Sequence, residues 1–346
     1  MPGAIILAPV VAGRRRAERR ISPRFVGICA GRPGRHRARP VTRPPPTSRT
    51  AILLAFAAIY GIWGSTYLAI RVAVATLPPF AMAGCRFMVA GALLYGWLAF
   101  RGRASATPRQ WRDNAVVGAL LLLGGNGLVV WAEQKIPSGI TTLIISVSPL
   151  FMVLFDWTLP HGIRPTRATF TGLALGFGGL VLLIGGGVPG GASFDLWRCG
   201  GLMVACISWS VGSLYSRHTK NPADPMLAAT LQMLLGGALM FLVGLARGET
   251  AGFQLQALTL RSTLAWGYLV AAGSLIAFPA YVYLLKHSTP ARVSTYAYVN
   301  PVVAVFLGWL ILGEPVSTRT LVASVVIVAA VAIITTQRGK AAAKPA

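Results

Sequence analysis

The sequence predicts an all-α polytopic membrane protein with ten transmembrane helices arranged as two inverted five-helix repeats. Three observations support this fold class. Of the 346 residues, 55% are hydrophobic and 12% are charged, whereas about a quarter of the residues of a soluble domain are charged. The apolar residues gather in stretches of about 20, the length that an α-helix needs to cross a bilayer. The second half of the chain also repeats landmarks of the first.

Landmark residues recur in the same order in the two halves. The matched pairs are Trp63 and Trp209, Arg71 and Arg217, Pro79 and Pro225, Gly91 and Gly237, Pro149 and Pro301, Thr166 and Thr318, and Arg167 and Arg319. Each half holds five apolar stretches, and five is an odd number of crossings. The second half is therefore expected to enter the bilayer upside down relative to the first, as in the inverted repeats of secondary transporters.

The first repeat is expected over residues 51–187. Its five helices are predicted at 51–70, 80–100, 115–132, 139–158 and 169–187. Stretches of this length must be helical, because the bilayer offers no hydrogen-bond partner to an open backbone. The first follows the stiff Pro44-Pro45-Pro46, and the second follows Pro78-Pro79. Glycines expected to let neighbouring helices pack closely are Gly118 and Gly124 in the third helix and Gly172 and Gly176 in the fifth.

The second repeat is expected over residues 199–336, after a glycine-rich link at 185–191. Its helices are predicted at 199–216, 226–246, 264–285, 292–312 and 320–336. In the eighth helix, Gly267 and Gly273 repeat the spacing of Gly118 and Gly124. Residues 337–346 form a tail. Lysine and arginine are more frequent in the short loops on the side of the termini, so both termini are expected in the cytoplasm.

Residues 1–49 are predicted to form a disordered extension rich in arginine and proline, because they have no apolar periodicity. This segment supplies much of the net charge of +24. The charge therefore does not indicate the clustered basic surface of a nucleic-acid-binding protein. Three interpretations stay open: a targeting peptide, an arm that binds anionic lipid headgroups, or a translation start near Val41 that excludes residues 1–40 from the native protein.

The sequence has no signature of catalysis or of a metal or cofactor site. Its four cysteines and four histidines are scattered, without zinc-ligand spacing or a disulfide pattern. It lacks the motifs of metalloproteases, serine hydrolases and nucleotide-binding loops. We therefore expect a protein that is not an enzyme, needs no cofactor or metal, and is not by itself an ATP-driven pump.

Arg86, in the second predicted helix, is the most informative polar residue. An ionisable side chain at membrane depth costs about 2.5 kcal/mol or more on insertion scales, so it needs a partner or a wet cavity. Its counterpart in the second repeat is the uncharged Gln232. The two residues could face one central cavity and bind an anionic group. Snorkelling toward the interface and an ion pair between helices are the alternatives.

Glu133, at the end of the third predicted helix, is the candidate coupling residue. A proton-coupled carrier needs a group whose pKa differs between its two access states, and a half-buried carboxylate can supply one. An interfacial cap and an ion-pair partner for Arg86 are the alternative roles. Protons are accordingly the coupling ion that we consider.

Pro149 and Pro301 are candidate hinges in the fourth and ninth helices. A proline inside a helix removes one backbone donor, frees a carbonyl and kinks the helix. Ser148 and Asn300 directly precede these prolines. They either satisfy the freed backbone groups or contact substrate.

Aromatic side chains with a few polar groups suit the wall of a cavity for an amphipathic small molecule. The candidates are Trp63, Tyr67, Trp209, Tyr281, Tyr296 and Tyr298. Asn126 joins them as an uncharged amide in the middle of the third helix, among Gly124, Gly125 and Gly127. Some of the aromatic residues are expected in interfacial belts instead.

Several segments resemble the EamA-type repeats of the drug/metabolite transporter superfamily. The segments similar to the first repeat are residues 63–71 and 77–87, Pro137-Ser138-Gly139 and Pro149-Leu150-Phe151. Residues 296–305 with Gly313-Glu314 resemble the second repeat. Within this superfamily, the segments resemble the YedA-like inner-membrane transporters. The resemblance covers residues 51–336 and implies ten helices, cytoplasmic termini and alternating access around a central cavity. Pro160-His161-Gly162 replaces the corresponding Leu-Gly-Glu in the first repeat, which argues against a symmetric role for Glu314.

These observations predict a secondary active transporter of the inner membrane that exports small metabolites, amino acids or amphipathic drugs by alternating access. An importer and a non-transporting membrane scaffold are the alternatives. The expected partners are a small-molecule substrate, the lipid bilayer and protons, and not nucleic acid. The oligomeric state stays open.

Overall fold

The computed structural model describes residues 49–159, 166–184, 195–219, 224–251, 258–288 and 296–343, and positions 253, 256 and 293. These residues form helices and turns and contain no β-strand, which confirms the all-α class for this part of the chain. Residues 1–48 of the predicted N-terminal extension, the link at 185–191 and the loop at 160–162 lie outside the described residues. Arg49 is the first residue of α1 (Arg49–Ala73).

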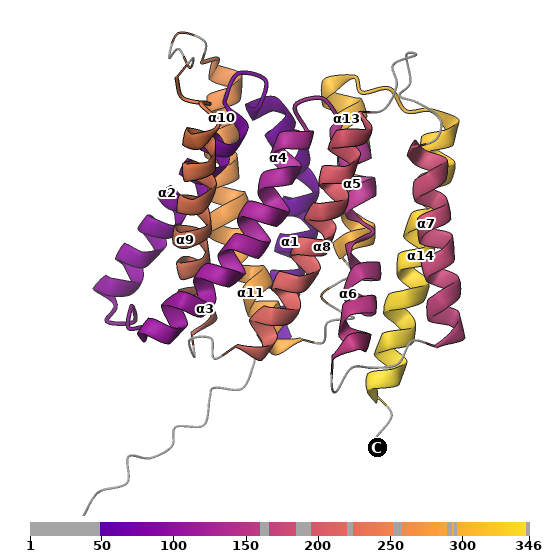
Figure 1. The fold of residues 1–346 in the computed structure, drawn as a ribbon, viewed down its shortest axis with the longest axis horizontal. Coiled ribbons are helices and arrows are strands. Elements are labelled where there is room, and N and C mark those ends of the chain that lie inside the picture. The colour runs from indigo at the N-terminus through magenta and orange to yellow at the C-terminus, as the bar shows by residue number, and fades with distance from the viewer. Residues whose placement is uncertain are drawn as a thin grey trace, which may run out of the picture. The chain divides into compact units, whose positions relative to one another are not determined.

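The described helices lie side by side as a bundle (Figure 1). In chain order they are α1 (Arg49–Ala73), α2 (Pro79–Phe100), α3 (Pro108–Gly118), η1 (Ala119–Gly127), α4 (Leu128–Ala132), α5 (Ser138–Ile145), α6 (Ser148–Thr158), α7 (Arg167–Ile184), α8 (Leu196–His218), α9 (Pro225–Ala246), α10 (Leu260–Tyr268), η3 (Leu269–Ala277), α11 (Phe278–His287), α13 (Tyr296–Leu312) and α14 (Thr318–Ala343). The segments η1 and η3 are π-helical, and they occupy matching places in the two halves.

Seven helical segments among the described residues are long and apolar enough to cross a membrane. They are Arg49–Ala73, Pro79–Phe100, Pro108–Ala132, Ser138–Thr158, Leu196–Arg217, Pro225–Ala246 and Leu260–His287. Val299–Leu312 and Thr318–Ala330 are shorter apolar segments. The chain is therefore a polytopic membrane protein, and the full count of ten spans in two inverted repeats stays a prediction.

Capping residues explain where several helices begin. The Thr107 hydroxyl accepts a hydrogen bond from the Gln110 backbone N–H at 3.3 Å, and the Gln110 side chain accepts one from the Thr107 N–H at 2.8 Å. This capping box stabilises a helix start, so α3 begins at Pro108, before the apolar stretch and earlier than the predicted residue 115. The Thr259 hydroxyl likewise accepts from the Ser262 N–H at 3.2 Å, so α10 begins at Leu260. At the other end of the chain, α14 continues to Ala343, into the predicted tail.

Contacts between helix ends distinguish the two sides of the bundle. We call the side on which α1 begins the N-side, and the side on which α1 ends the far side. On the far side, Arg71 at the end of α1 donates to the backbone oxygen of Glu133 at the end of α4. On the N-side, Arg103 after α2 pairs with Asp224 before α9 at 2.6 Å. These contacts show that α1 and α4 end on the same side and that α9 begins where α2 ends.

Glycines allow the closest helix contacts. A β-carbon at Gly236 in α9 would lie 2.6 Å from the Gly118 backbone oxygen, and one at Gly84 in α2 would lie 2.6 Å from the Phe241 nitrogen. The predicted close approach at Gly118 is therefore confirmed. Gly267 has no atom within 4 Å of its β-position among the described residues, so the packing role expected there is not found.

The two predicted hinge prolines lie in different local structures. In the first copy, α5 ends at Ile145 and α6 begins at Ser148, with Pro149 in its first turn. In the second copy, Pro301 lies inside α13, which continues without a break. Of the two prolines, only Pro149 lies next to an interruption of its helix. The hinge roles of both prolines stay predictions.

Candidate substrate pocket

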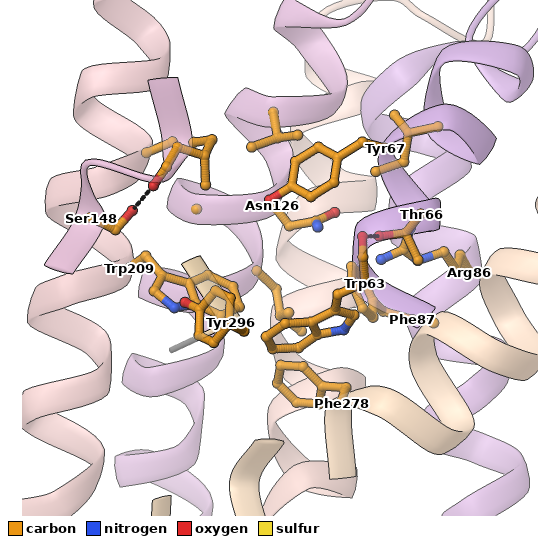
Figure 2. A pocket seen from close by; sticks show the side chains of 17 residues that line it. Trp63, Thr66, Tyr67, Arg86, Phe87, Asn126, Ser148, Trp209, Phe278 and Tyr296 are labelled. Carbon is orange, nitrogen blue, oxygen red and sulfur yellow. Dashed lines mark hydrogen bonds between the residues drawn. The ribbon is translucent and has the colours of Figure 1, made fainter. Parts of the chain in front are cut away.

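A cavity of about 60 Å³ lies inside the bundle, lined by residues from both halves of the chain. Most of the predicted substrate contacts line it (Figure 2). These are Trp63 and Tyr67 from α1, Arg86 from α2, Asn126 from η1, Ser148 from α6, Trp209 from α8 and Tyr296 from α13. Residues far apart in the sequence therefore meet at one place, as the predicted binding site requires.

Four aromatic side chains pack together on the N-side of this cavity, and we call them the aromatic cluster: Trp63, Trp209, Tyr281 and Tyr296. The Trp63 ring centroid lies 4.9 Å from that of Tyr281, 5.3 Å from Tyr296 and 5.7 Å from Trp209. The Tyr281 hydroxyl also hydrogen-bonds the Ser213 hydroxyl at 2.8 Å. Tyr281 lines a second hollow, together with Ser213 and Tyr296. The cluster thus separates the cavity from a hollow nearer the N-side.

Arg86 is 3% exposed and lines the cavity. Its Nε donates to the Ser274 hydroxyl of η3 at 3.1 Å, and its guanidinium carbon lies 4.2 Å from the Phe87 ring centroid. Its Nη1 has no hydrogen-bond partner among the described residues, and no carboxylate there lies within ion-pair distance of it. A buried donor with a free N–H beside a cavity favours the binding role over snorkelling or an ion pair.

Gln232, the repeat counterpart of Arg86, does not share the cavity. It is fully buried in α9, and its Nε2 donates to the Asn114 side-chain oxygen at 2.8 Å. Since Gln232 is not among the cavity-lining residues, the expectation that Arg86 and Gln232 face one central cavity is wrong. The amide is used to join α9 to α3.

Three further predicted polar contacts differ in their surroundings. The Asn126 side-chain oxygen is buried at the cavity without a hydrogen-bond partner among the described residues. The Ser148 hydroxyl lines the cavity but donates to the Ile145 backbone oxygen at 2.6 Å, so it satisfies the broken helix. Asn300 is 2% exposed and its oxygen is also unpartnered there, but it does not line the cavity. The side chain of Tyr298 is outside the described part.

Glu133 is the residue after α4 and is fully buried. Both of its carboxylate oxygens are without a hydrogen-bond partner among the described residues. Its carboxylate interacts electrostatically with Arg71, Arg86 and Glu314. It lies at the far-side end of α4, whose Val129 lines the cavity, and its burial disfavours a permanent negative charge.

The π-helical segments η1 and η3 were not anticipated from the sequence. Gly125 of η1 and Gly273 of η3 both line the cavity. A β-carbon at Gly125 would lie 2.8 Å from Trp209 Cε3, and one at Gly273 would lie 3.1 Å from Thr66 Cγ2. The glycine-rich run around Asn126 was the available signal. Glycine content does not distinguish a π-helix from an α-helix, although π-helical turns are frequent at functional sites.

Comparison with known proteins shows which family the chain belongs to. The model of the EamA-like transporter family matches the chain twice, at residues 49–185 and 196–336. The chain is 40% identical to the uncharacterised inner membrane transporter YedA of Escherichia coli over 290 residues, which are 83% of this chain and 92% of YedA.

A more distant relative and a solved structure are also similar to the chain. The uncharacterised transporter YvbV of Bacillus subtilis is 26% identical over 84% of this chain and 93% of its own length. A protein of known crystal structure superposes with a TM-score of 0.60 at 25% identity, over 84% of this chain and 98% of that chain. The chain belongs to the EamA-like transporter family.

Proposed function

We propose that this transporter is a secondary active exporter of small metabolites, amino acids or amphipathic compounds, working by alternating access. In this proposal ten helices in two inverted repeats cross the inner membrane, with both termini in the cytoplasm. The N-side of the bundle then faces the cytoplasm and the far side faces outward.

The observation that carries the proposal is the pair of unpartnered polar groups at the cavity. Arg86 Nη1 is a charged donor and Asn126 Oδ1 is an acceptor, and neither has a partner among the described residues. Leaving a buried polar group unpaired costs about 1–3 kcal/mol. A ligand with an anionic group and a nearby N–H or O–H would satisfy both, and the aromatic walls would cover its apolar part.

The volume of the cavity supports a mechanism in which helices move to admit substrate. At about 60 Å³ the cavity holds a few water molecules, whereas sites for drug-sized ligands measure roughly 300–1,000 Å³. Substrate entry therefore requires the helices to separate on one side. The aromatic cluster closes the route toward the N-side, so its rearrangement is the expected step that admits substrate from the cytoplasm.

Glu133 is the proposed proton-coupling group. Its buried carboxylate has no hydrogen-bond donor among the described residues and lies within electrostatic range of Arg86. Binding of an anion at Arg86 would change the field at this carboxyl group, and a change in its protonation is one physical means of coupling.

Flux measurements in proteoliposomes test the proposal. Purified protein is first screened by thermal shift against the common amino acids and their carboxyl-amide analogues, because Arg86 should prefer the free carboxylate. Compounds that stabilise the protein are then tested as radiolabelled substrates in counterflow. Flux no faster than in protein-free liposomes for every compound would contradict the transport proposal. The response of flux to an imposed gradient in vesicles of known orientation separates export from import.

A further inference from the structure

The carboxylate of Glu314 joins the two halves of the chain on the far side. Glu314 follows α13, and its Oε1 accepts a hydrogen bond from the Ser138 backbone N–H at 2.9 Å. Its Oε2 accepts from the Ser138 hydroxyl at 2.9 Å and from the Gly139 N–H at 3.3 Å. Ser138 and Gly139 form the first turn of α5, whose own N-cap residue, Pro137, provides no side-chain cap. A residue of one family repeat therefore caps a helix of the other.

The backbone around Glu314 fixes the position of this carboxylate. Gly313 has φ of 65°, a conformation that glycine adopts readily. The Gly313 N–H donates to the Trp309 oxygen at 3.2 Å and the Glu314 N–H donates to the Gly308 oxygen at 3.1 Å, as at a glycine-terminated helix end. A β-carbon at Gly308 would lie 3.0 Å from the Ser138 hydroxyl oxygen. The end of α13 and the start of α5 are thus held in direct contact.

Both helices that meet at Glu314 reach the cavity farther along their lengths. Ile145 at the end of α5 and Tyr296 at the start of α13 line the cavity. With a rise of about 1.5 Å per residue, Tyr296 lies roughly 24 Å along α13 from its last residue, Leu312. Separation of α5 from α13 on the far side would break all three hydrogen bonds and widen the approach to the cavity from that side.

An alternative environment for the Glu314 carboxylate lies next to it. Glu314 lines an open hollow of about 650 Å³ on the far side, together with Arg71 and Arg261. When α5 moves away, the carboxylate can be hydrated there or pair with an arginine, so its release need not leave a buried unpaired charge. Two arrangements of similar energy are what a gate requires.

We propose that Glu314 is a positioning residue that holds the far-side gate closed by capping α5 across the repeat boundary. This role rests on the alternating-access mechanism proposed above. It also gives a reason for the asymmetry of the two copies, because the cap needs one carboxylate on one side of the bundle.

Glu249 provides a matched control. It lies in the loop after α9 and its carboxylate accepts from the Ala81 N–H in the first turn of α2 at 3.0 Å. This cap also crosses between the halves, but α2 and α9 interlock at several glycines: a β-carbon at Gly91 would lie 2.9 Å from Leu234 Cγ, and one at Gly237 would lie 2.9 Å from Phe87 Cβ. Loss of this cap should alter stability without opening a gate.

The test measures access to the cavity from each side of the membrane. The parent variant lacks the four native cysteines and carries Ile70→Cys, since Ile70 lines the cavity next to Arg71 of the far-side hollow. A membrane-impermeant maleimide is applied to right-side-out and inside-out vesicles. Glu314→Gln should raise far-side labelling by about tenfold, which corresponds to about 1.4 kcal/mol less stabilisation of the closed gate. Ser138→Ala, which keeps the backbone donors, should give a smaller increase, and Glu249→Gln should give none.

Two results would overturn the role of Glu314. One is unchanged far-side labelling in both Glu314→Gln and Ser138→Ala, and the other is an equal increase in Glu249→Gln. Ser138→Ala keeps the test decisive if Glu314→Gln does not fold. Failure of the transport proposal itself would be recognised separately, since wild-type protein would then show no flux.

Discussion

Replacement of Arg86 by methionine should weaken substrate binding while leaving the protein at least as stable. Arg86 is 3% exposed, and its contacts are one hydrogen bond to Ser274 and the Phe87 ring, with no carboxylate in ion-pair distance among the described residues. A hydrogen bond from a charged group contributes roughly 1.5–3 kcal/mol. Its loss should therefore weaken the affinity for an anionic substrate by roughly 10- to 150-fold.

The stability of the same variant should change in the other direction. Burial of a charge without an ion-pair partner costs free energy, and no carboxylate among the described residues lies within ion-pair distance of Arg86. The melting temperature of Arg86→Met in detergent should therefore equal or exceed that of the wild type. Affinity is read from the concentration dependence of the thermal shift with the substrate found by counterflow.

The conservative variant Arg86→Lys distinguishes charge from geometry. It keeps the positive charge but loses the planar donor fork, so affinity should fall by less than in Arg86→Met. A strong loss of stability in Arg86→Met with unchanged affinity would refute the reasoning. That result would mean that Arg86 holds helices together and does not bind substrate.

Three further predictions concern Glu133, Gly125 and Glu249. Glu133→Gln should remove the pH dependence of flux. Its melting temperature should be unchanged or higher, because the buried carboxylate oxygens of Glu133 have no hydrogen-bond donor among the described residues. Flux that keeps its wild-type pH profile would exclude proton coupling through Glu133. Gly125→Ala should reduce flux and lower the free energy of unfolding by about 1–3 kcal/mol, since its β-carbon would lie 2.8 Å from Trp209 Cε3. Gly178→Ala in α7, with no atom within 4 Å among the described residues, is its control. Burial raises the pKa of Glu249 in the loop after α9, despite hydrogen bonds from Ala81 and Phe80. An acid with a raised folded pKa makes stability fall as pH rises from its unfolded pKa through its folded pKa, so the melting temperature of Glu249→Gln should decline less than that of the wild type over this window.

The sequence was sufficient for the all-α membrane class and for much of the pocket lining, for a physical reason. Lipid imposes helices on long apolar stretches, and a repeat places its matched residues at matched depths. Trp63, Trp209 and Arg86 could therefore be brought to one cavity without a structure. The choice between neighbouring residues could not be made this way. Gln232 and Asn300 are as buried as Arg86, but only the direction of a side chain around its helix decides whether it meets the cavity.

Helix starts and backbone irregularities were less predictable. The starts of α3 and α10 depend on caps at Thr107 and Thr259, outside the apolar stretches that hydropathy detects. The interruption before Pro149 has no equivalent at Pro301, although the local sequences align. Tertiary contacts decide such cases: the Ser148 backbone oxygen at the interruption accepts a hydrogen bond from the Ser210 hydroxyl of α8 at 2.9 Å.

The similarities and differences between the two halves indicate a division of roles. The π-helical segments η1 and η3 occur in both copies, and each places a glycine at the cavity against a residue of another helix. The two halves therefore share this element at the cavity. The polar groups differ: Arg86 lies at the cavity while Gln232 binds Asn114, and Glu314 caps α5 across the halves. An asymmetric substrate needs an asymmetric site, and a gate on one side needs a clamp on that side only. We infer that duplication supplied the common helical frame, and that divergence at these few positions supplied recognition and gating.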